Sequence, residues 1–328
     1  MENNYINFCL CGDKNFIIPI TVAITSILEN IEKSRICRFF LLTTGFSDKE
    51  IDKILKLKNK HNFEVINMPV ENYIYLFDKI DITKCKIPYV SLATYYRFLM
   101  FKILPKDVEK CFYIDGDMII DTDLSIIYDR LNEDKLASAV VEPLAMQHRK
   151  DILSHCYELE CFKNFKNDYL KYPYIQAGFF LINLKKAKEK NIFEQLIDFI
   201  TICPNTPYVD QDVINAVIGQ QYPDLINYLE PSYNVFCNMN YDETFDDAFY
   251  NEKIIKESFV KPKIYHYGGS WKPWNSTLTI HHYDIWWKYL KLSPYKKLKN
   301  PKKKIIGIIE NERYKIYKIF FIKICLKK

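Results

Sequence analysis

Residues 5–11 (YINFCLC), 12–15 (GDKN) and 19–29 (PITVAITSILE) decide the fold class of this chain. An apolar run, a polar loop and an apolar stretch of helical length follow one another, which predicts a strand, a loop and a helix. Two more strand-like apolar runs occupy 35–44 and 63–68. Strands that alternate with helices predict an α/β fold, a mostly parallel, doubly wound sheet with helices on both faces.

The helix between the second and third strands has its own start signal. Ser47 and Glu50 have the spacing of a capping box, in which the side chain of each residue accepts a hydrogen bond from the backbone N–H of the other.

Ligands of a doubly wound sheet bind beyond the carboxyl ends of its strands, so the site is expected in loops that follow strands. The later strands are predicted at 111–114, 136–141, 177–184 and 263–267, and later helices at 91–104 and 210–218.

Composition indicates a globular chain. Of 328 residues, 48% are hydrophobic and 16% aromatic, which is too apolar for disorder. The ten cysteines lack the close pairs of a zinc site, and we expect reduced core thiols. Neither a leader-like pattern nor an apolar run of membrane-spanning length is present, so we expect a cytoplasmic protein.

Charge divides the chain into an acidic body and a basic tail. Residues 291–328 carry 13 Lys and Arg against 2 acidic residues, which leaves 33 basic against 39 acidic residues in 1–290. We expect 1–290 to be the catalytic domain and 291–328 an amphipathic tail for an anionic membrane surface, since its basic residues alternate with Ile, Tyr and Phe. A solvated helix is the alternative for the tail. The acidic body argues against nucleic-acid binding.

The triplet Asp115-Gly116-Asp117 directly follows a predicted strand. Two carboxylates two residues apart can converge on one divalent cation where the backbone turns, and Gly116 permits that turn. An ordinary Asp-Gly turn between strands is the alternative that the triplet alone leaves open.

A second segment, residues 266–274 (HYGGSWKPW), follows the last predicted strand. His266 can add a nitrogen ligand, the glycines let backbone N–H groups approach a phosphate, and Lys272 can neutralise it. A mixed oxygen and nitrogen set suits Mn²⁺ better than Mg²⁺, which stays the alternative. Taken alone, His266 also fits a structural histidine. The two segments together favour a metal and phosphate site.

Six segments, in order, resemble the retaining glycosyltransferases of family 8, which include bacterial lipopolysaccharide galactosyl- and glucosyltransferases and glycogenin. The resemblance runs from about Tyr5 to Trp274 and implies a fold of the GT-A type. The segments are GDKNF (12–16), YYR (95–97), DGD (115–117), QAGFFLINL (176–184), DQD (210–212) and HYGGSWKPW (266–274).

The resemblance implies a binding role for each matched residue on the donor side. The uridine would be held by the Cys11 backbone, Asp13 and Asn15, with Phe16 against the uracil ring, and Arg97 would contact the donor. The metal would be ligated by Asp115, Asp117 and His266, with Gly269 and Lys272 at the β-phosphate. The residues alone leave alternatives: a solvated turn for Asp13 and Asn15, and a structural ion pair for Arg97.

On the sugar side, the resemblance implies Asp210 and Gln211 as the catalytic residues next to the hexose. A helix N-cap is the alternative for Asp210. Glu142 and Gln176 would shape the pocket for sugar and acceptor. The family often has Asn in place of Gln176, and some galactosyltransferases have Asp in place of Glu142, so each differs by one methylene.

The resemblance therefore implies a Mn²⁺-dependent enzyme that transfers galactose or glucose from a UDP-sugar to a saccharide acceptor with retention. A lipid-linked surface glycan such as lipopolysaccharide would be the acceptor, and the enzyme would work on the inner face of the cytoplasmic membrane. The alternative is a protein that binds or hydrolyses a UDP-sugar without transferring the hexose. A dinucleotide oxidoreductase is disfavoured because no G-x-G-x-x-G follows the first strand.

Overall fold

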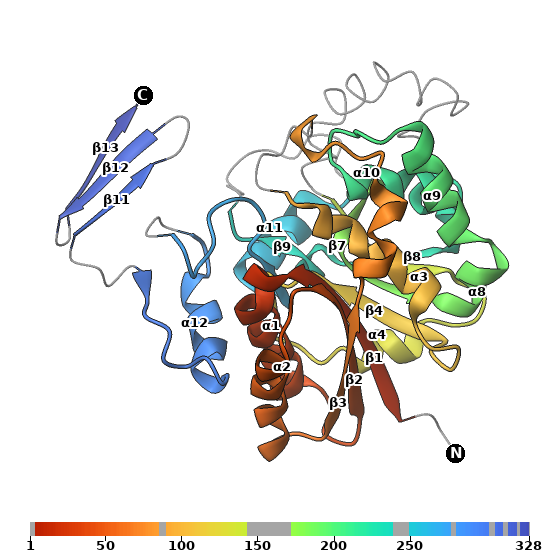
Figure 1. Cartoon of the computed structure of the whole chain (residues 1–328), viewed down its shortest axis with the longest axis horizontal. Helices are drawn as coiled ribbons and strands as arrows, with labels where there is room; N and C mark the ends of the chain where they lie inside the picture. The colour runs from red at the N-terminus through yellow and green to blue at the C-terminus, as the bar shows by residue number, and fades with distance from the viewer. Residues whose placement is uncertain are drawn as a thin grey trace.

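The computed structural model describes residues 4–84, 90–142, 172–238, 249–276 and 280–301, and the backbone of three strands between 306 and 327. A seven-stranded sheet of order β3-β2-β1-β4-β7-β6-β8 forms its centre and has helices on both sides (Figure 1). This confirms the predicted α/β class. The strands are β1 (Tyr5–Asp13), β2 (Ile36–Thr44), β3 (Phe63–Pro69), β4 (Lys110–Ile114), β6 (Ala137–Val141), β7 (Ile175–Asn183) and β8 (Ile226–Leu229).

The sheet is parallel except at β7. The pairs β1–β2, β2–β3, β1–β4 and β6–β8 are parallel, whereas β7 runs antiparallel to both β4 and β6. All nine residues of β7 are buried, and a strand covered on both faces has the same apolar pattern in either direction. The amino end of β7 therefore lies at the sheet edge where β1 and β4 have their carboxyl ends.

Alternate residues of each strand pack into two separate cores. In β1, Ile6, Phe8 and Leu10 face one cluster and Cys9 and Cys11 face the other, as the period of two requires. The first cluster is covered by α1 (Ile17–Asn30), α2 (Asp48–Leu55) and α4 (Ser125–Arg130). The second is covered by η5 (Leu92–Leu99), α3 (Met100–Ile103), α9 (Ile192–Ile202), α10 (Asp210–Ile214) and η6 (Asn215–Gly219).

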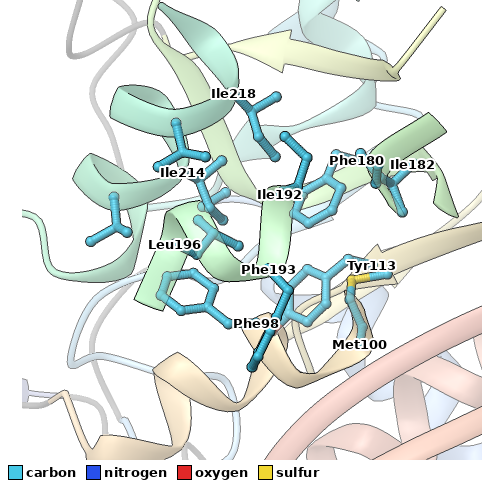
Figure 2. Packing of buried hydrophobic residues seen from close by; sticks show 14 of the residues in the cluster. Phe98, Met100, Tyr113, Phe180, Ile182, Ile192, Phe193, Leu196, Ile214 and Ile218 are labelled. Atoms are coloured by element: carbon cyan, nitrogen blue, oxygen red, sulfur yellow. The ribbon is translucent and has the colours of Figure 1, made fainter. Parts of the chain in front are cut away.

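Figure 2 shows the second cluster between β4, β7 and the helices packed against them. Phe98 and Met100 point toward Tyr113 and Phe193, and Ile192, Ile214 and Ile218 approach Phe180 and Ile182 from the other side. These contacts hold the helices whose ends carry predicted site residues.

Two predicted helices deviate from regular α geometry. The segment 91–104 is a 3₁₀ helix (η5) followed by the single turn α3, and its residues Tyr95 to Met100 are buried. The segment 210–218 is α10 followed by the π-helical turn η6. Asn215, at the start of that turn, donates to the Ile175 carbonyl and accepts from the Ile175 N–H, both at 2.7 Å. A side chain that bonds to β7 in this way accompanies the wider turn.

The predicted strand at 263–267 belongs to a second, small sheet. It contains β5 (Met118–Ile120), β9 (Val235–Phe236) and β10 (Ile264–His266), with β10 in the middle. In the antiparallel pair of β10 and β5, His266 lies opposite Met118. This pairing brings residue 266 beside the Asp115–Asp117 triplet.

The capping box is present. The Ser47 N–H donates to Glu50 at 2.8 Å, and the hydrogen bonds from Ser47 lower the pKa of Glu50. The buried cysteines Cys9, Cys11, Cys37, Cys111 and Cys237 are free thiols, as expected. Cys203 takes part in a disulfide, so the expectation of ten reduced thiols is wrong at that position.

The end of the chain follows α11 (Glu252–Val260) and α12 (Tyr283–Leu292). Residues just beyond α12 still pack on the body. Tyr295 packs against the first cluster and against a further small cluster that includes Trp286 of α12, and the Tyr283 hydroxyl donates to Asn300 at 2.5 Å. The tail backbone then forms an antiparallel sheet of β11 (Ile306–Glu310), β12 (Tyr314–Ile319) and β13 (Ile322–Lys327), apart from the main sheet (Figure 1). The alternative of a solvated helix is therefore wrong.

Among the described residues, no helix combines the length and the apolar character that crossing a bilayer requires.

Candidate active site

A cavity of about 620 Å³ opens at the sheet edge where β1 and β4 end and β7 begins. Every residue that the sequence predicted for the site lines it, although the residues come from segments as far apart as β1 and the loop after β10. The predicted lining residues are Cys11, Asp13, Asn15, Phe16, Arg97, Asp115, Gly116, Asp117, Glu142, Gln176, Asp210, Gln211, His266, Gly269 and Lys272.

Three of them form a cluster with the composition of a metal site. One ligand atom each from Asp115, Asp117 and His266 can be chosen so that all lie within 4.8 Å of one another. His266 Nε2 is 3.4 Å from Asp117 Oδ1 and 3.9 Å from Asp115 Oδ2. The backbone ties the pieces together, because the Tyr267 N–H donates to the Asp117 carbonyl at 3.1 Å. Two carboxylate oxygens and one imidazole nitrogen fit a borderline-hard divalent cation such as Mn²⁺.

Asp115 is held through one oxygen only. Its Oδ1 accepts from the Tyr113 hydroxyl at 2.8 Å and from Arg97 at 2.9 Å, while Oδ2 faces His266. A Cβ on Gly178 would come within 2.5 Å of Oδ2. The carboxylate is thus oriented by hydrogen bonds on one side and by the bare glycine on the other.

Arg97 joins two carboxylates beneath the cavity. Its guanidinium lies 2.9 Å from Asp115 and 2.9 Å from Asp210, donates to the Ala177 carbonyl at 2.6 Å, and stacks over the Tyr113 ring at 4.4 Å. Burial lowers the pKa of Arg97, but the charges of Asp115 and Asp210 outweigh it and raise the pKa above its ordinary value. The structural ion pair is therefore present, and a contact of Arg97 with the donor stays a prediction.

Lys272 reaches the metal cluster rather than open solvent. Its ammonium group lies 2.5 Å from Asp117 Oδ2 and donates to the Tyr267 carbonyl at 2.7 Å. Burial alone would raise the pKa of Asp117, but the positive charge of the Lys272 ammonium group outweighs it and holds the pKa well below its usual range. Nearby Gly269 has a φ of +84°, which favours glycine there.

The first loop forms the end of the cavity predicted for uridine. Asp13 accepts the Asn15 N–H at 2.8 Å, so this carboxylate shapes the turn, and Phe16 contacts Trp274 edge-on with ring centres 6.3 Å apart. Gly116 is required for packing and not for a special turn: its φ is not positive, and a Cβ would lie 2.6 Å from the Ile20 side chain in α1.

Asp210 is the first residue of α10, and Val209 occupies the cap position, so the N-cap alternative is wrong. Asp210 accepts from the Thr94 hydroxyl at 2.6 Å, and burial raises its pKa to about 6 although Arg97 offsets part of the rise. Val209 has a φ of +48°, which is rare for a β-branched residue and marks backbone strain beside the site. Gln211 accepts the Ala177 N–H at 3.0 Å.

Glu142 and Gln176 are both buried at the cavity wall. The Glu142 N–H donates to the Tyr174 carbonyl at 2.8 Å, which fixes the backbone at the end of β6. Gln176 Oε1 accepts from the Gly178 N–H at 2.5 Å and from Asn234 at 2.6 Å.

Three supporting residues were not foreseen from the sequence. Asn234 contacts both Gln176 and His266, Thr94 holds Asp210, and Asp212 accepts from the Tyr174 hydroxyl at 2.6 Å behind the cavity wall. Asp212 and Thr94 stand within matched segments or predicted helices, where a polar residue on an apolar face was a usable signal. Asn234 had no such signal, because its partners are distant in sequence.

The doubly wound sheet, with two carboxylates and a histidine grouped at the edge where β1 and β4 end, has the GT-A type of fold found in sugar transferases. The model of Glycosyl transferase family 8 matches residues 7–278, and the chain belongs to that family. It is therefore a glycosyltransferase.

Individual relatives are distant but extend over most of the chain. General stress protein A of Bacillus subtilis is 23% identical over 92% of this chain and 98% of that protein. The lipopolysaccharide 1,2-glucosyltransferase of Escherichia coli is 24% identical over 89% of this chain and 79% of that protein.

Solved structures confirm the fold. The galactosyltransferase LgtC, solved with donor and acceptor sugar analogues, has a TM-score of 0.65 at 20% identity and covers 88% of this chain and 96% of its own. The bifunctional glycosyltransferase WbbM has a TM-score of 0.73 at 21% identity over 90% of this chain, which spans 51% of the WbbM chain.

Proposed function

We propose that the protein transfers glucose or galactose from a UDP-sugar to a saccharide acceptor, with Mn²⁺ as cofactor and with retention of the anomeric configuration. The observation that carries the proposal is the convergence of Asp115, Asp117 and His266 with Lys272 on one wall of the cavity. The similarity to a lipopolysaccharide glucosyltransferase and to a galactosyltransferase supports the hexose and a surface-glycan acceptor.

The donor would lie along the cavity from the first loop to α10. The uridine would be held at one end by Cys11, Asp13, Asn15 and Phe16, and Arg97 would contact the donor from the floor of the cavity. When bound, Mn²⁺ held by Asp115, Asp117 and His266 would neutralise charge on the diphosphate, because the UDP leaving group becomes more negative as the glycosidic bond breaks.

Lys272 has a second role in this proposal. In the absence of a donor its ammonium group pairs with Asp117. A diphosphate bound beside Gly269 would offer Lys272 a more highly charged partner, and the lysine would then stabilise the departing UDP.

Retention is proposed to proceed by attack on the face from which UDP departs. A carboxamide is a weak nucleophile, and Gln211 Oε1 already accepts a hydrogen bond from the Ala177 N–H. Asp210, the adjacent carboxylate, is engaged by Arg97 and Thr94. In this mechanism a β-phosphate oxygen takes the acceptor proton, and Gln211 stabilises positive charge on the sugar ring.

The acceptor is proposed to be lipid-linked, with Glu142 and Gln176 on its side of the hexose and the basic tail at the anionic inner surface of the cytoplasmic membrane. The charge of residues 291–328 supports this, with 13 basic against 2 acidic residues.

UDP release tests the proposal. The protein is incubated with UDP-glucose, UDP-galactose or their N-acetyl forms, with Mn²⁺, Mg²⁺ or a chelator, and with or without saccharide acceptors. We expect Mn²⁺-dependent release with one hexose donor, faster with acceptor. Release that no acceptor accelerates would favour a UDP-sugar hydrolase, and metal-independent release would refute the metal assignment. Lys272→Ala should lower turnover in the same assay.

A further inference from the structure

Three buried polar side chains form a hydrogen-bonded row that ends at the metal cluster. Gln176, Asn234 and His266 are exposed by only 5%, 1% and 4%. Asn234 Nδ2 is 2.6 Å from Gln176 Oε1, and Asn234 Oδ1 is 3.0 Å from His266 Nδ1. They come from β7, the residue before β9, and β10, so only the folded chain joins them.

The direction of every hydrogen bond in this row follows from one backbone group. The Gly178 N–H can only donate, and it lies 2.5 Å from the Gln176 amide, so the facing atom of Gln176 must be its oxygen. That oxygen also faces Asn234, which must therefore present its NH₂ group. The other atom of the Asn234 amide is then oxygen, and it faces His266 Nδ1.

An amide oxygen can only accept, so His266 Nδ1 must carry a proton. In a neutral imidazole the other nitrogen is then bare, and this nitrogen, Nε2, is the one that faces Asp117 Oδ1 at 3.4 Å. The Phe236 ring, with its centre 4.3 Å from that of the imidazole, restricts the plane of His266. The lone pair of His266 Nε2 therefore points toward the proposed metal position in a fixed orientation.

We propose that Asn234 is the positioning residue of this site: it holds His266 in the Nδ1–H tautomer that binds a metal, and at the same time holds Gln176 with its oxygen turned inward. The metal half of this proposal rests on the proposed function, whereas the tautomer does not. Because Gly178 and Asn234 together use both acceptor positions of Gln176 Oε1, the amide offers the cavity its NH₂ group. The NH₂ group of Gln176 would then donate a hydrogen bond to an oxygen of the sugar.

The tautomer can be measured directly in metal-free protein. Long-range ¹H–¹⁵N spectra distinguish the two neutral tautomers of each histidine ring, and His266→Gln identifies the signals of residue 266. His282 provides an internal control, because its Nε2 lies 3.0 Å from the Phe259 carbonyl and must be protonated. Spectra are recorded at a pH above which the ring signals no longer move. We expect opposite tautomers for His266 and His282. An Nε2–H tautomer for His266 would overturn the proposal.

Two substitutions separate the ends of the row. Asn234→Leu removes both contacts, and Asn234→Asp keeps an acceptor for His266 but removes the donor to Gln176. We expect Asn234→Leu to mix the tautomers and to weaken Mn²⁺ binding by about 10- to 100-fold, measured by electron paramagnetic resonance of free Mn²⁺. Asn234→Asp should keep the tautomer and at least wild-type Mn²⁺ affinity, yet lower kcat/KM for the donor. Equal loss of Mn²⁺ binding in both folded variants would contradict the proposal.

The outcomes also separate this inference from the proposed function. An Nδ1–H tautomer in a protein that binds no Mn²⁺ would leave the row intact and refute the metal assignment. Tight Mn²⁺ binding by a protein whose His266 is the Nε2–H tautomer would support the metal assignment and refute the role of Asn234.

Discussion

Gly178→Ala tests how tightly the metal cluster is built. The added Cβ would lie 2.5 Å from Asp115 Oδ2 and 2.8 Å from the Met118 side chain, whereas ordinary contacts begin at 3.4 Å. Asp115 Oδ2 must therefore retreat by roughly 0.9 Å. It cannot do so freely, because Oδ1 is held by Arg97 and Tyr113 at 2.9 and 2.8 Å.

The size of that shift predicts its effect on the metal. Metal–ligand distances tolerate changes of about 0.2 Å, so a displacement of roughly 0.9 Å removes one of three protein ligands. We expect Mn²⁺ affinity in Gly178→Ala to fall at least about 10-fold, which is about 1.4 kcal/mol. Overpacking should also lower the free energy of unfolding by about 1–3 kcal/mol.

Gly45→Ala is the matched control. Gly45 has a φ of +73°, but a Cβ there meets only Lys14 at an ordinary 3.5 Å. It should destabilise the protein by about 1–2 kcal/mol through backbone strain and leave Mn²⁺ binding unchanged. Titration of free Mn²⁺ by electron paramagnetic resonance, with thermal unfolding of each variant, provides the readout. Wild-type Mn²⁺ affinity in folded Gly178→Ala would refute the assignment of Asp115 Oδ2 as a metal ligand.

Four further predictions concern Asp212, Gln211, Asp117 and the basic tail. Burial raises the pKa of Asp212 to about 6 from 3.8, so the stability associated with its protonated form is present below about pH 4 and is lost as the pH rises through about 6. Asp212→Asn should therefore remove up to about 3 kcal/mol of pH dependence from the unfolding free energy between those limits; parallel pH profiles for the two proteins would contradict this. Gln211→Ala should retain turnover above background, reduced by about 10²-fold, whereas kinetically competent glycosyl-enzyme detected by mass spectrometry would establish a nucleophile instead. Asp117→Asn should abolish Mn²⁺-dependent transfer while the circular dichroism spectrum stays native, and full activity would exclude Asp117 from the metal site. Removal of residues 302–328, beyond the part of the tail that packs on the body, should release the protein from anionic liposomes but preserve transfer to a soluble acceptor; unchanged partitioning, or partitioning insensitive to salt, would argue against a membrane role.

The sequence predicted the elements that depend on local patterns. The apolar runs of β1, β2 and β4, the helix α1 and the capping box of α2 all follow from side-chain period and spacing within about a dozen residues. The order of six short segments was sufficient to identify the family. The roles of the matched residues remain predictions, although all of them line one cavity.

Local sequence patterns did not predict the direction of a strand or the regularity of a helix where these depend on residues distant in sequence. The sequence predicted a mostly parallel sheet but not which strand is reversed, because a strand buried on both faces has no sequence signature of its direction; the reversed strand is β7. The segment 210–218 was predicted to form one helix, but the side chain of Asn215 bonds to β7 and a π-helical turn forms. The fit of Gly178 against Asp115 is likewise invisible in sequence, because the two residues meet only through the pairing of β4 with β7.

The sequence by itself determined the fold class, the family and the chemical types available to the site, because side-chain chemistry and short-range periodicity are local properties. Only the tertiary structure decided which atoms those residues present. Asn234 faces both Gln176 and His266, and Arg97 is shared between Asp115 and Asp210. The reason is physical: a hydrogen bond or an ion pair depends on distances of about 3 Å, and the chain supplies such distances between remote segments only when the strands are paired and the cores are closed.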